Sequence, residues 1–205
     1  ADFQDQDKLG RLKVITDLGL EDASACATLP TTGQPIAFPD ETPVAGCVYE
    51  NLYSFGSRSF TIWDTSTGRP VFDSGSEFER ITGQQLGGSF NASNDSNDGD
   101  DRSDDKGPEP EAVEIATING NTFAFVVLER VGGVMVYNIT NPQNAKFVQY
   151  INPRDFTVDD DAVEANLAGP LGPEDVKFIT QDGEMYLLVS NEVSGTLSIY
   201  SVTLL

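Results

Sequence analysis

Carboxylates in two dense runs are the residues of this sequence best suited to chemistry. The first run is NASNDSNDGDDRSDDKGPEPE, residues 91–111, and the second is RDFTVDDDAVEANLAGPLGPE, residues 154–174. Calcium takes about six to eight oxygen ligands from flexible loops, and carboxylates and amides supply them. The runs therefore predict calcium binding, and the candidate metal ligands are Asp95, Asp98, Asp100, Asp101, Asp104, Asp105, Glu109, Glu111, Asp159, Asp161 and Glu174.

The predicted calcium site is irregular, because the first run departs from an EF-hand loop. With Gly99 at the sixth position, Asp105 stands where an EF-hand has a bidentate Glu, and no flanking helices are expected. Two alternatives stay open. The first run can be a disordered acidic spacer. The GPE that closes each run can be a turn leading into a strand, with Pro fixing φ and Glu accepting backbone N–H groups.

The remaining residue types exclude several kinds of chemistry. The sequence has no histidine, so no Ser-His-Asp or Cys-His nucleophile and no zinc site of the usual catalytic type can form. The chain has 33 acidic and 12 basic residues, a formal net charge of -21, which argues against nucleic acid and anionic membranes. We expect no catalytic residues in this chain alone, no nucleic-acid partner and no membrane insertion.

The two cysteines, Cys26 and Cys47, lie in a stretch rich in Pro, Thr and Gly. One disulfide between them is the first interpretation, and it implies an oxidising compartment. Two unrelated buried thiols are the alternative. Three sequons, at Asn91, Asn94 and Asn138, are glycosylation acceptors if the source glycosylates.

A sequence repeat supplies the elements that must position the carboxylates. GPEPEAVEIATINGNTFAFVVLERVGGVMVYNIT, residues 107–140, aligns without a gap with GPEDVKFITQDGEMYLLVSNEVSGTLSIYSVT, residues 172–203, from Pro110 on Pro173 onward. The first copy predicts the strands AVEIATI, TFAFVVLE, VMVYNIT and AKFVQYI, and the second predicts VKFIT, EMYLLVSN and TLSIYSVTL. The dipeptides NG and DG between strands favour type I′ hairpin turns. Gly132 and Gly195 would supply the positive φ of the next turn.

Two further glutamates recur in the repeat, since Glu129 falls on Glu192. Both follow a predicted strand. We expect them to hold a turn or to pair with a basic neighbour such as Arg58 or Arg130. A catalytic pair of carboxylates, as in glycoside hydrolases, is the less favoured interpretation.

Four antiparallel strands joined by tight turns form one blade of a β-propeller, so the predicted fold class is an all-β propeller. A looser copy, NLYSFGSRSFTIWDTSTGRPVFDSG, puts Trp63 at the place of Tyr137 and Tyr200. The expected layout over residues 1–205 is a single arc with blades at 11–82, 110–151 and 173–205, a Cys-bearing insertion at 21–49, and acidic linkers at 91–109 and 154–172. A β-sandwich is the competing architecture.

This layout has two consequences. Glu111 and Glu174 would begin the innermost strands and face the central channel, where carboxylates could bind cations. Propellers close with about four to eight blades. An arc of about three blades therefore needs further blades, either from the same precursor or from a partner chain, and it leaves open strand edges and apolar faces at its ends.

The segments LYSFGSRSFTIWD, NTFAFVVLERVGGVMVYNITNP and VSNEVSGTLSIY resemble the choice-of-anchor I family. The resemblance covers residues 8–20 and 50–205 and corresponds to the C-terminal part of the family domain; residues 21–49 depart from its pattern. It implies a secreted or surface bacterial propeller, with relatives among regions of large proteins labelled alkaline phosphatase and a mesenchyme-specific cell-surface glycoprotein.

Together these observations predict a secreted, calcium-stabilised propeller that acts as a binding or structural module at a cell surface or in an extracellular assembly. The expected location is extracellular, at the cell surface or periplasmic. One alternative is part of an alkaline-phosphatase-type phosphoesterase whose missing ligands come from elsewhere. Another is a subunit of a surface layer or filament, in which exposed blade edges make a homo-oligomer.

Overall fold

The computed structural model describes residues 58–103 and 106–204, together with residues 19, 21, 48–51 and 53. The chain divides into two compact units, one of Ala1–Gly56 with Ser103–Lys106 and one of Ser57–Arg102 with Gly107–Leu205. In the first unit, the Glu21 amide donates a hydrogen bond to the Val48 carbonyl and the Glu50 amide donates to the Gly19 carbonyl. Cys26, Cys47 and most of the insertion at 21–49 lie outside the described residues.

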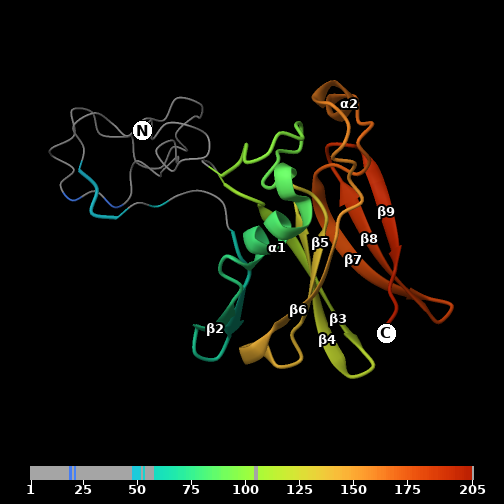
Figure 1. The fold of residues 1–205 in the computed structure, drawn as a ribbon. Helices are drawn as coiled ribbons and strands as arrows, with labels where there is room; N and C mark the ends of the chain where they lie inside the picture. Colours follow the sequence, from blue (N-terminus) through green and yellow to red (C-terminus); the bar gives the residue numbers. More distant parts are fainter. Residues whose placement is uncertain are drawn as a thin grey trace. The chain divides into compact units, whose positions relative to one another are not determined.

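The second unit contains three antiparallel sheets, shown in Figure 1. The first is the hairpin of β1 (Thr61–Asp64) and β2 (Arg69–Asp73). The second runs in the order β3 (Pro110–Ile118), β4 (Asn121–Leu128), β5 (Val134–Asn138) and β6 (Lys146–Ile151). The third runs β7 (Pro173–Gln181), β8 (Glu184–Asn191) and β9 (Thr196–Ser201). The described residues form no closed barrel, and the all-β prediction is confirmed.

Turn chemistry joins these strands as the sequence predicts. Asn119 and Gly120 have φ values of 49° and 80°, and Asp182 and Gly183 have φ values of 54° and 85°. Two consecutive residues with positive φ are what a type I′ turn requires, and its twist matches that of the flanking strands. The same dipeptide positions therefore close the β3–β4 and β7–β8 hairpins.

The repeat also holds at the level of single backbone hydrogen bonds. Glu109 precedes β3 with φ 52°, and its counterpart Gly172 precedes β7 with φ 66°. The Glu129 amide donates to the Glu109 carbonyl at 2.9 Å, and the Glu192 amide donates to the Gly172 carbonyl at 2.7 Å. Each of the two sheets is thus preceded by a residue with left-handed backbone geometry whose carbonyl accepts an equivalent backbone hydrogen bond. This residue is a glutamate in one copy and a glycine in the other.

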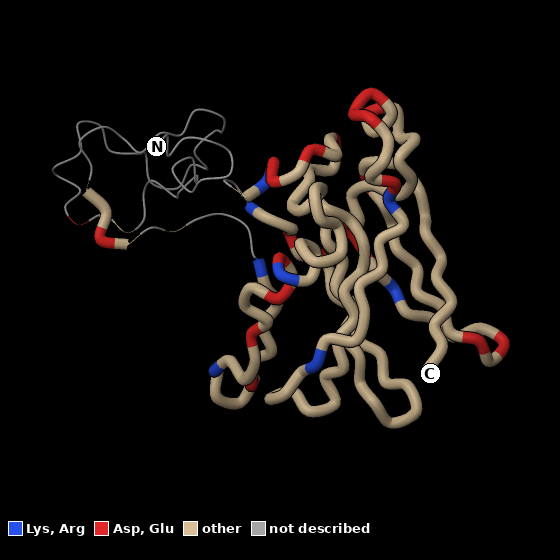
Figure 2. The backbone as a smooth tube through the Cα atoms, viewed as in Figure 1, with Lys and Arg blue, Asp and Glu red and all other residues tan. Residues whose placement is uncertain are grey.

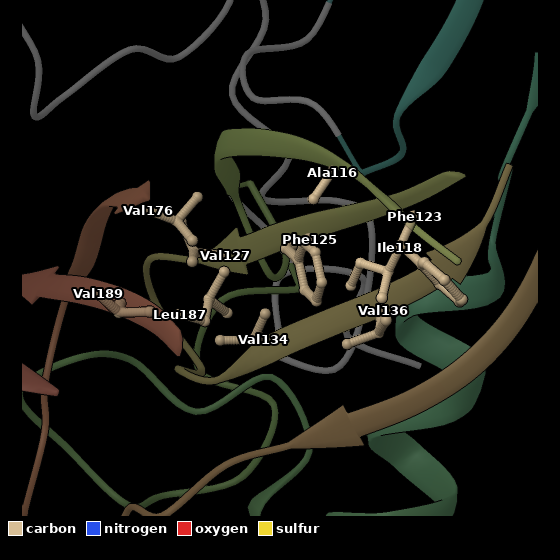
Figure 3. Close-up of a cluster of buried hydrophobic side chains, with 10 residues drawn as sticks. All are labelled: Ala116, Ile118, Phe123, Phe125, Val127, Val134, Val136, Val176, Leu187 and Val189. Carbon is tan, nitrogen blue, oxygen red and sulfur yellow. The ribbon is translucent and has the colours of Figure 1, made fainter. Parts of the chain in front are cut away.

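The main core lies between the β3–β6 sheet and the β7–β9 sheet. Period-two alternation sends one set of side chains from each strand to this interface. Figure 3 shows these side chains, which are Ala116, Ile118, Phe123, Phe125, Val127, Val134, Val136, Val176, Leu187 and Val189. Full burial of such a side chain contributes about 1.5–3 kcal/mol. The stacked rings of Phe125 and Phe178, with centroids 6.1 Å apart, extend the same contact.

A second core covers the opposite face of the β3–β6 sheet. It joins Met135 and Tyr137 on β5 to Phe78 and Ile81 on a helix, α1 (Glu77–Leu86). The Tyr137 hydroxyl donates a 3.0 Å hydrogen bond to Glu77, so this buried phenol is satisfied by the helix. The aromatic ring of Phe60, just before β1, packs edge-on against that of Tyr137, and the two ring centroids are 4.9 Å apart.

Two helices are the main departure from the predicted all-β architecture. The helix α1 occupies part of the range expected to belong to the first blade, and a short helix, α2 (Asp160–Glu164), lies in the second acidic run. The strands predicted for the two repeat copies are confirmed to within a few residues at their ends. In the first blade, the described strands are β1 and β2.

Candidate functional site

The two acidic runs, which the sequence placed at equivalent points of the repeat, touch each other in the structure. Asn97 in the first run makes the contact. Its backbone amide donates to the Asp160 carboxylate at 2.9 Å, and its side-chain amide donates to the Val158 carbonyl at 2.8 Å and the Asp155 carbonyl at 3.2 Å. One asparagine therefore fixes the first run against the turn that leads into α2.

Arg154 fills the space between the two runs. Its guanidinium donates to the Ser93 carbonyl at 2.6 Å, the Ser96 carbonyl at 2.7 Å and the side-chain oxygen of Asn97 at 3.1 Å. A longer bond of 3.3 Å reaches the Arg130 carbonyl. These oxygens are the type that would surround a metal ion, and here a guanidinium, with its planar fork of donors, takes them up.

Burial of Arg154 shapes its electrostatics. The residue is 5% exposed, and desolvation lowers its pKa to about 10 while the nearby charges of Asp95 and Asp160 oppose that fall. It therefore stays charged at neutral pH. The ring of Phe156 lies 4.9 Å from the guanidinium carbon, a cation–π contact that further compensates the lost hydration.

Glu109, a candidate metal ligand, is buried and held by two arginines. Its carboxylate accepts a 2.6 Å bond from Arg130 and a 3.3 Å bond from Arg102, and the residue is 7% exposed. A left-handed φ is unfavourable for a residue with a Cβ, by about 1–2 kcal/mol. Charge-assisted hydrogen bonds to the two guanidinium groups offset that strain.

Arg130 also pairs with Glu129, at 3.1 Å. The prediction that Glu129 pairs with a basic neighbour is confirmed with Arg130, whereas Arg58 pairs with Glu79. Burial raises the pKa of Glu129 against the opposing effect of Arg130. The charges of Glu109, Glu111 and Glu174 also raise it.

Four glutamates from two pairs of equivalent positions influence one another at this end of the sheets. We call Glu111, Glu129, Glu174 and Glu192 the inner carboxylate cluster. Desolvation and the charges of Glu111 and Glu192 raise the pKa of Glu174, and Arg130 opposes the rise. The sequence placed Glu111 and Glu174 at the starts of equivalent strands, and they are the second residues of β3 and β7.

The other candidate ligands are dispersed. Asp95, Asp98 and Asp161 are exposed, while Asp100 and Asp101 are half-buried; Asp104 and Asp105 lie outside the described residues. Within the described ranges, no three Asp, Glu, His or Cys side chains lie close enough to hold a metal ion. The arrangement as it stands therefore forms no preassembled coordination shell from those residues.

Asp159 has a local structural role. It is the N-cap of α2, and its carboxylate accepts a 3.0 Å bond from the Ala162 amide. This satisfies one of the amides that every helix start leaves free. Figure 2 shows acidic residues at α2 and at the β7–β8 turn.

Sequence reasoning missed Arg154 and the role of Asn97, the two residues that organise the site. Both stand in runs that were interpreted through their carboxylates. One signal could have found Arg154, because it is the only basic residue between Lys146 and Lys177. A lone cation among so many carboxylates is a candidate internal counter-ion.

Two sheets that repeat one another, with carboxylates gathered where their first strands begin, define an all-β repeat protein. The choice-of-anchor I domain family matches residues 36–142, just over half of the chain, and the chain belongs to this family. The predicted resemblance is confirmed. The match includes residues 36–49, which we expected to depart from the family pattern, and it ends before the second copy of the repeat.

The chain is also similar to Gigasin-3a of Magallana gigas. The two are 28% identical over 166 residues, which cover 75% of this chain and 58% of the relative. The chain therefore spans a little over half the length of this curated relative. Membership of the family makes the chain a surface or secreted module. In the described part of the chain, no helix is long and apolar enough to cross a membrane.

Proposed function

We propose that the chain is a section of a β-propeller that serves as a calcium-stabilised binding or structural module at a cell surface or in an extracellular assembly. The β3–β6 sheet is one four-stranded blade, and β7–β9 supply three strands of the next. The chain provides a rigid stack of sheets, and further sheets complete it.

One observation carries this proposal, and it concerns the face of the β7–β9 sheet that points away from β3–β6. Its exposed or half-buried apolar residues are Ile179, Tyr186, Leu188, Leu197 and Ile199. Under the repeat these positions are the counterparts of Ala116, Phe123, Phe125, Val134 and Val136, which the β3–β6 sheet buries against β7–β9. The face that packs in one copy is thus free in the next. A stack of like sheets that continues beyond β7–β9 explains this.

The opposite end of the stack supports the same proposal. Trp63 takes the repeat position of Tyr137 and Tyr200, and it is 56% exposed. Tyr137 is fully buried beneath α1 and Phe60, and Tyr200 packs against the core between the two larger sheets. The aromatic position is therefore covered wherever a preceding sheet is described.

An extended chain tests the proposal. Thr140 and Thr203 are equivalent, so residues 1–203 followed by residues 141–205 add one more repeat in register. Burying the five free apolar side chains is expected to raise the Tm by about 10 °C, from about 2–4 °C per kcal/mol for a domain of this size. The control carries Val176→Asp and Phe178→Asp in the added copy only. Equal Tm values for the two extended chains would contradict a stacking face.

Calcium is the second part of the proposal, and the inner carboxylate cluster supports it. Desolvation and the charges of Glu111 and Glu192 raise the pKa of Glu174, and a divalent cation bound beside these carboxylates would relieve their repulsion. Thermal melts with calcium and with a chelator, with elemental analysis, test this part. We expect a higher Tm with calcium in the parent and little response in the Glu111→Gln/Glu174→Gln double variant. Glu164→Gln, an exposed change on α2, is the control.

An unchanged Tm and no bound calcium would contradict the calcium proposal. The acidic runs would then be spacer segments held in place by Arg154. Turnover of a generic phosphoester by the same preparations separates the module from the phosphoesterase alternative. Activity that disappears in the double variant would overturn the proposed function.

A further inference from the structure

The structure separates one of the three Asn-X-Ser/Thr sequons from the other two. Asn91 is fully buried and Asn94 is 8% exposed. Asn138 is half-buried at the end of β5, and residues 140–144, which follow it in the turn to β6, are all exposed. An oligosaccharide on a side-chain amide needs solvent around it, because it is bulky and hydrophilic. Of the three sequons, the one at Asn138 meets this condition.

Asn138 closes its turn with the carbonyl oxygen of its side chain, which accepts a 3.0 Å hydrogen bond from the Thr140 amide. Asp64 occupies the equivalent position in the looser copy of the repeat and closes the same kind of turn. Its carboxylate accepts a 2.8 Å hydrogen bond from the Ser66 amide. Aspartate has no side-chain nitrogen, so this turn depends on an acceptor oxygen alone. The side-chain nitrogen of Asn138 therefore has no part in closing the turn.

Glycosylation of an asparagine changes the nitrogen of the amide and keeps its carbonyl oxygen. A glycosylated Asn138 would therefore still accept the hydrogen bond from Thr140. The turn and the end of β5 would keep their geometry, while the sugar chain would extend from the exposed turn into solvent.

The two other sequons lie where the fold leaves no room for a sugar. The Asn91 side-chain nitrogen donates a long 3.5 Å hydrogen bond to Glu79, and the Asn94 side-chain oxygen accepts one of 3.4 Å from the Ser93 hydroxyl. The Ser93 carbonyl in turn accepts the 2.6 Å hydrogen bond from Arg154. A glycan on Asn91 or Asn94 would have to displace the segment that Arg154 holds.

We propose that Asn138 is an N-glycosylation site, and that it is the one acceptor among the three sequons in the folded protein. The donor is an oligosaccharide joined through a diphosphate to a lipid. The bond from the anomeric carbon to the diphosphate oxygen breaks, and the lipid diphosphate leaves with the electron pair. The Asn138 nitrogen bonds to that carbon and loses one proton. A surface or secreted module is the kind of chain that meets such donors.

A glycan on Asn138 would lie at the end of the β3–β6 sheet away from the acidic runs. Arg154 reaches the Arg130 carbonyl, shortly before β5 begins at Val134. Asn138 is four residues further along this strand, about 13 Å away. It pairs with Phe123, which follows the β3–β4 turn, and Figure 1 shows this turn at the end of the sheets opposite α2. The glycan would leave the inner carboxylate cluster uncovered.

Secretion of the full chain from a cultured eukaryotic cell line tests the inference. The secreted protein is treated with a glycosidase that converts each occupied asparagine into aspartate, and its peptides are mapped by mass spectrometry. We expect Asn138 to be occupied and Asn91 and Asn94 to be unmodified. Circular dichroism and a cooperative thermal melt check that the secreted protein is folded.

Two variants separate the glycan from the fold. Asn138→Asp keeps the acceptor oxygen of the turn, as in Asp64, and removes the acceptor nitrogen. It is expected to lose the whole glycan mass and to melt within about 2 °C of the glycosylated parent. Ser96→Ala is the matched control, because it removes the Asn94 sequon and is expected to leave the glycan mass unchanged.

A reference glycoprotein secreted by the same cells shows that donor and transferase are active. An unmodified Asn138 in the folded, secreted chain would then overturn the inference. A glycan on Asn91 or Asn94 in the folded protein would do the same, as would occupancy of Asn138 only in misfolded material retained by the cells. The inference needs the turn geometry alone and does not depend on the proposed propeller or on calcium.

Discussion

Arg154 offers the sharpest test of how the acidic end of the molecule is held together. Replacing it with methionine keeps the aliphatic stem and removes four hydrogen bonds, to Ser93, Ser96, Asn97 and Arg130. A hydrogen bond to a charged group contributes about 1.5–3 kcal/mol when buried. Water can reach Ser96 and Asn97, which are half-buried, and removal of a desolvated charge offsets part of the loss. We expect a net loss of about 3 kcal/mol in the free energy of unfolding.

Urea denaturation followed by circular dichroism measures this loss, which corresponds to a fall in Tm of about 6–12 °C. Arg154→Lys keeps the charge but not the fork of donors, so it should lose about half as much. Arg80→Met is the control, because Arg80 is mostly exposed and makes one surface pair with Glu77. A free energy of unfolding for Arg154→Met within about 0.5 kcal/mol of the parent would refute the role of Arg154 as internal counter-ion.

Two further predictions concern the sheets. Lys177, chiefly through its hydrogen bond, lowers the pKa of Glu114. The pair therefore stabilises the fold above the ordinary pKa of glutamate, and the contribution is lost as pH falls through the lowered value. Urea midpoints measured from pH 3 to 7 should fall less steeply toward low pH in Glu114→Gln than in the parent. An unchanged pH dependence would show that this pair does not cause the loss of stability in acid. Gly133→Ala should destabilise the fold by about 3 kcal/mol or more, because a Cβ there would lie 2.5 Å from the Ile151 carbonyl and φ is +87°. Gly120→Ala, with a φ of +80° and open space around it, should lose only about 1–2 kcal/mol, and equal Tm shifts for the two variants would contradict the clash.

The sheets were predictable from the sequence because their signals are local. Alternating apolar residues and the Asn-Gly and Asp-Gly turns define each strand and hairpin within a few residues of chain. The helix α1 was not predicted, since EFERITGQQL contains a central glycine and few apolar residues. Phe78 and Ile81, three residues apart, lie on the same face of α1, and both are buried. Tertiary packing against Tyr137 stabilises a helix that intrinsic propensity alone does not favour.

The candidate site was predictable in position but not in contacts. The repeat placed Glu111 and Glu174 at the starts of equivalent strands, and that follows from strand register alone. The pairing of Glu109 with Arg102 and Arg130 could not be predicted, because it depends on a left-handed backbone turn that the other copy makes with glycine. Long-range contacts by single polar side chains leave no periodic trace in a sequence.

The bond between Glu114 and Lys177 has a consequence for how such a molecule could arise. The two residues occupy the same position in successive copies of the repeat, and the Lys177 ammonium donates to the Glu114 carboxylate at 2.7 Å. The Phe178 amide donates to the same carboxylate oxygen at 3.1 Å. Two freshly duplicated modules would carry like charges here, or none, and could stack in either order. Opposite charges at this position are complementary only in the present order, in which the sheet with the glutamate precedes the sheet with the lysine.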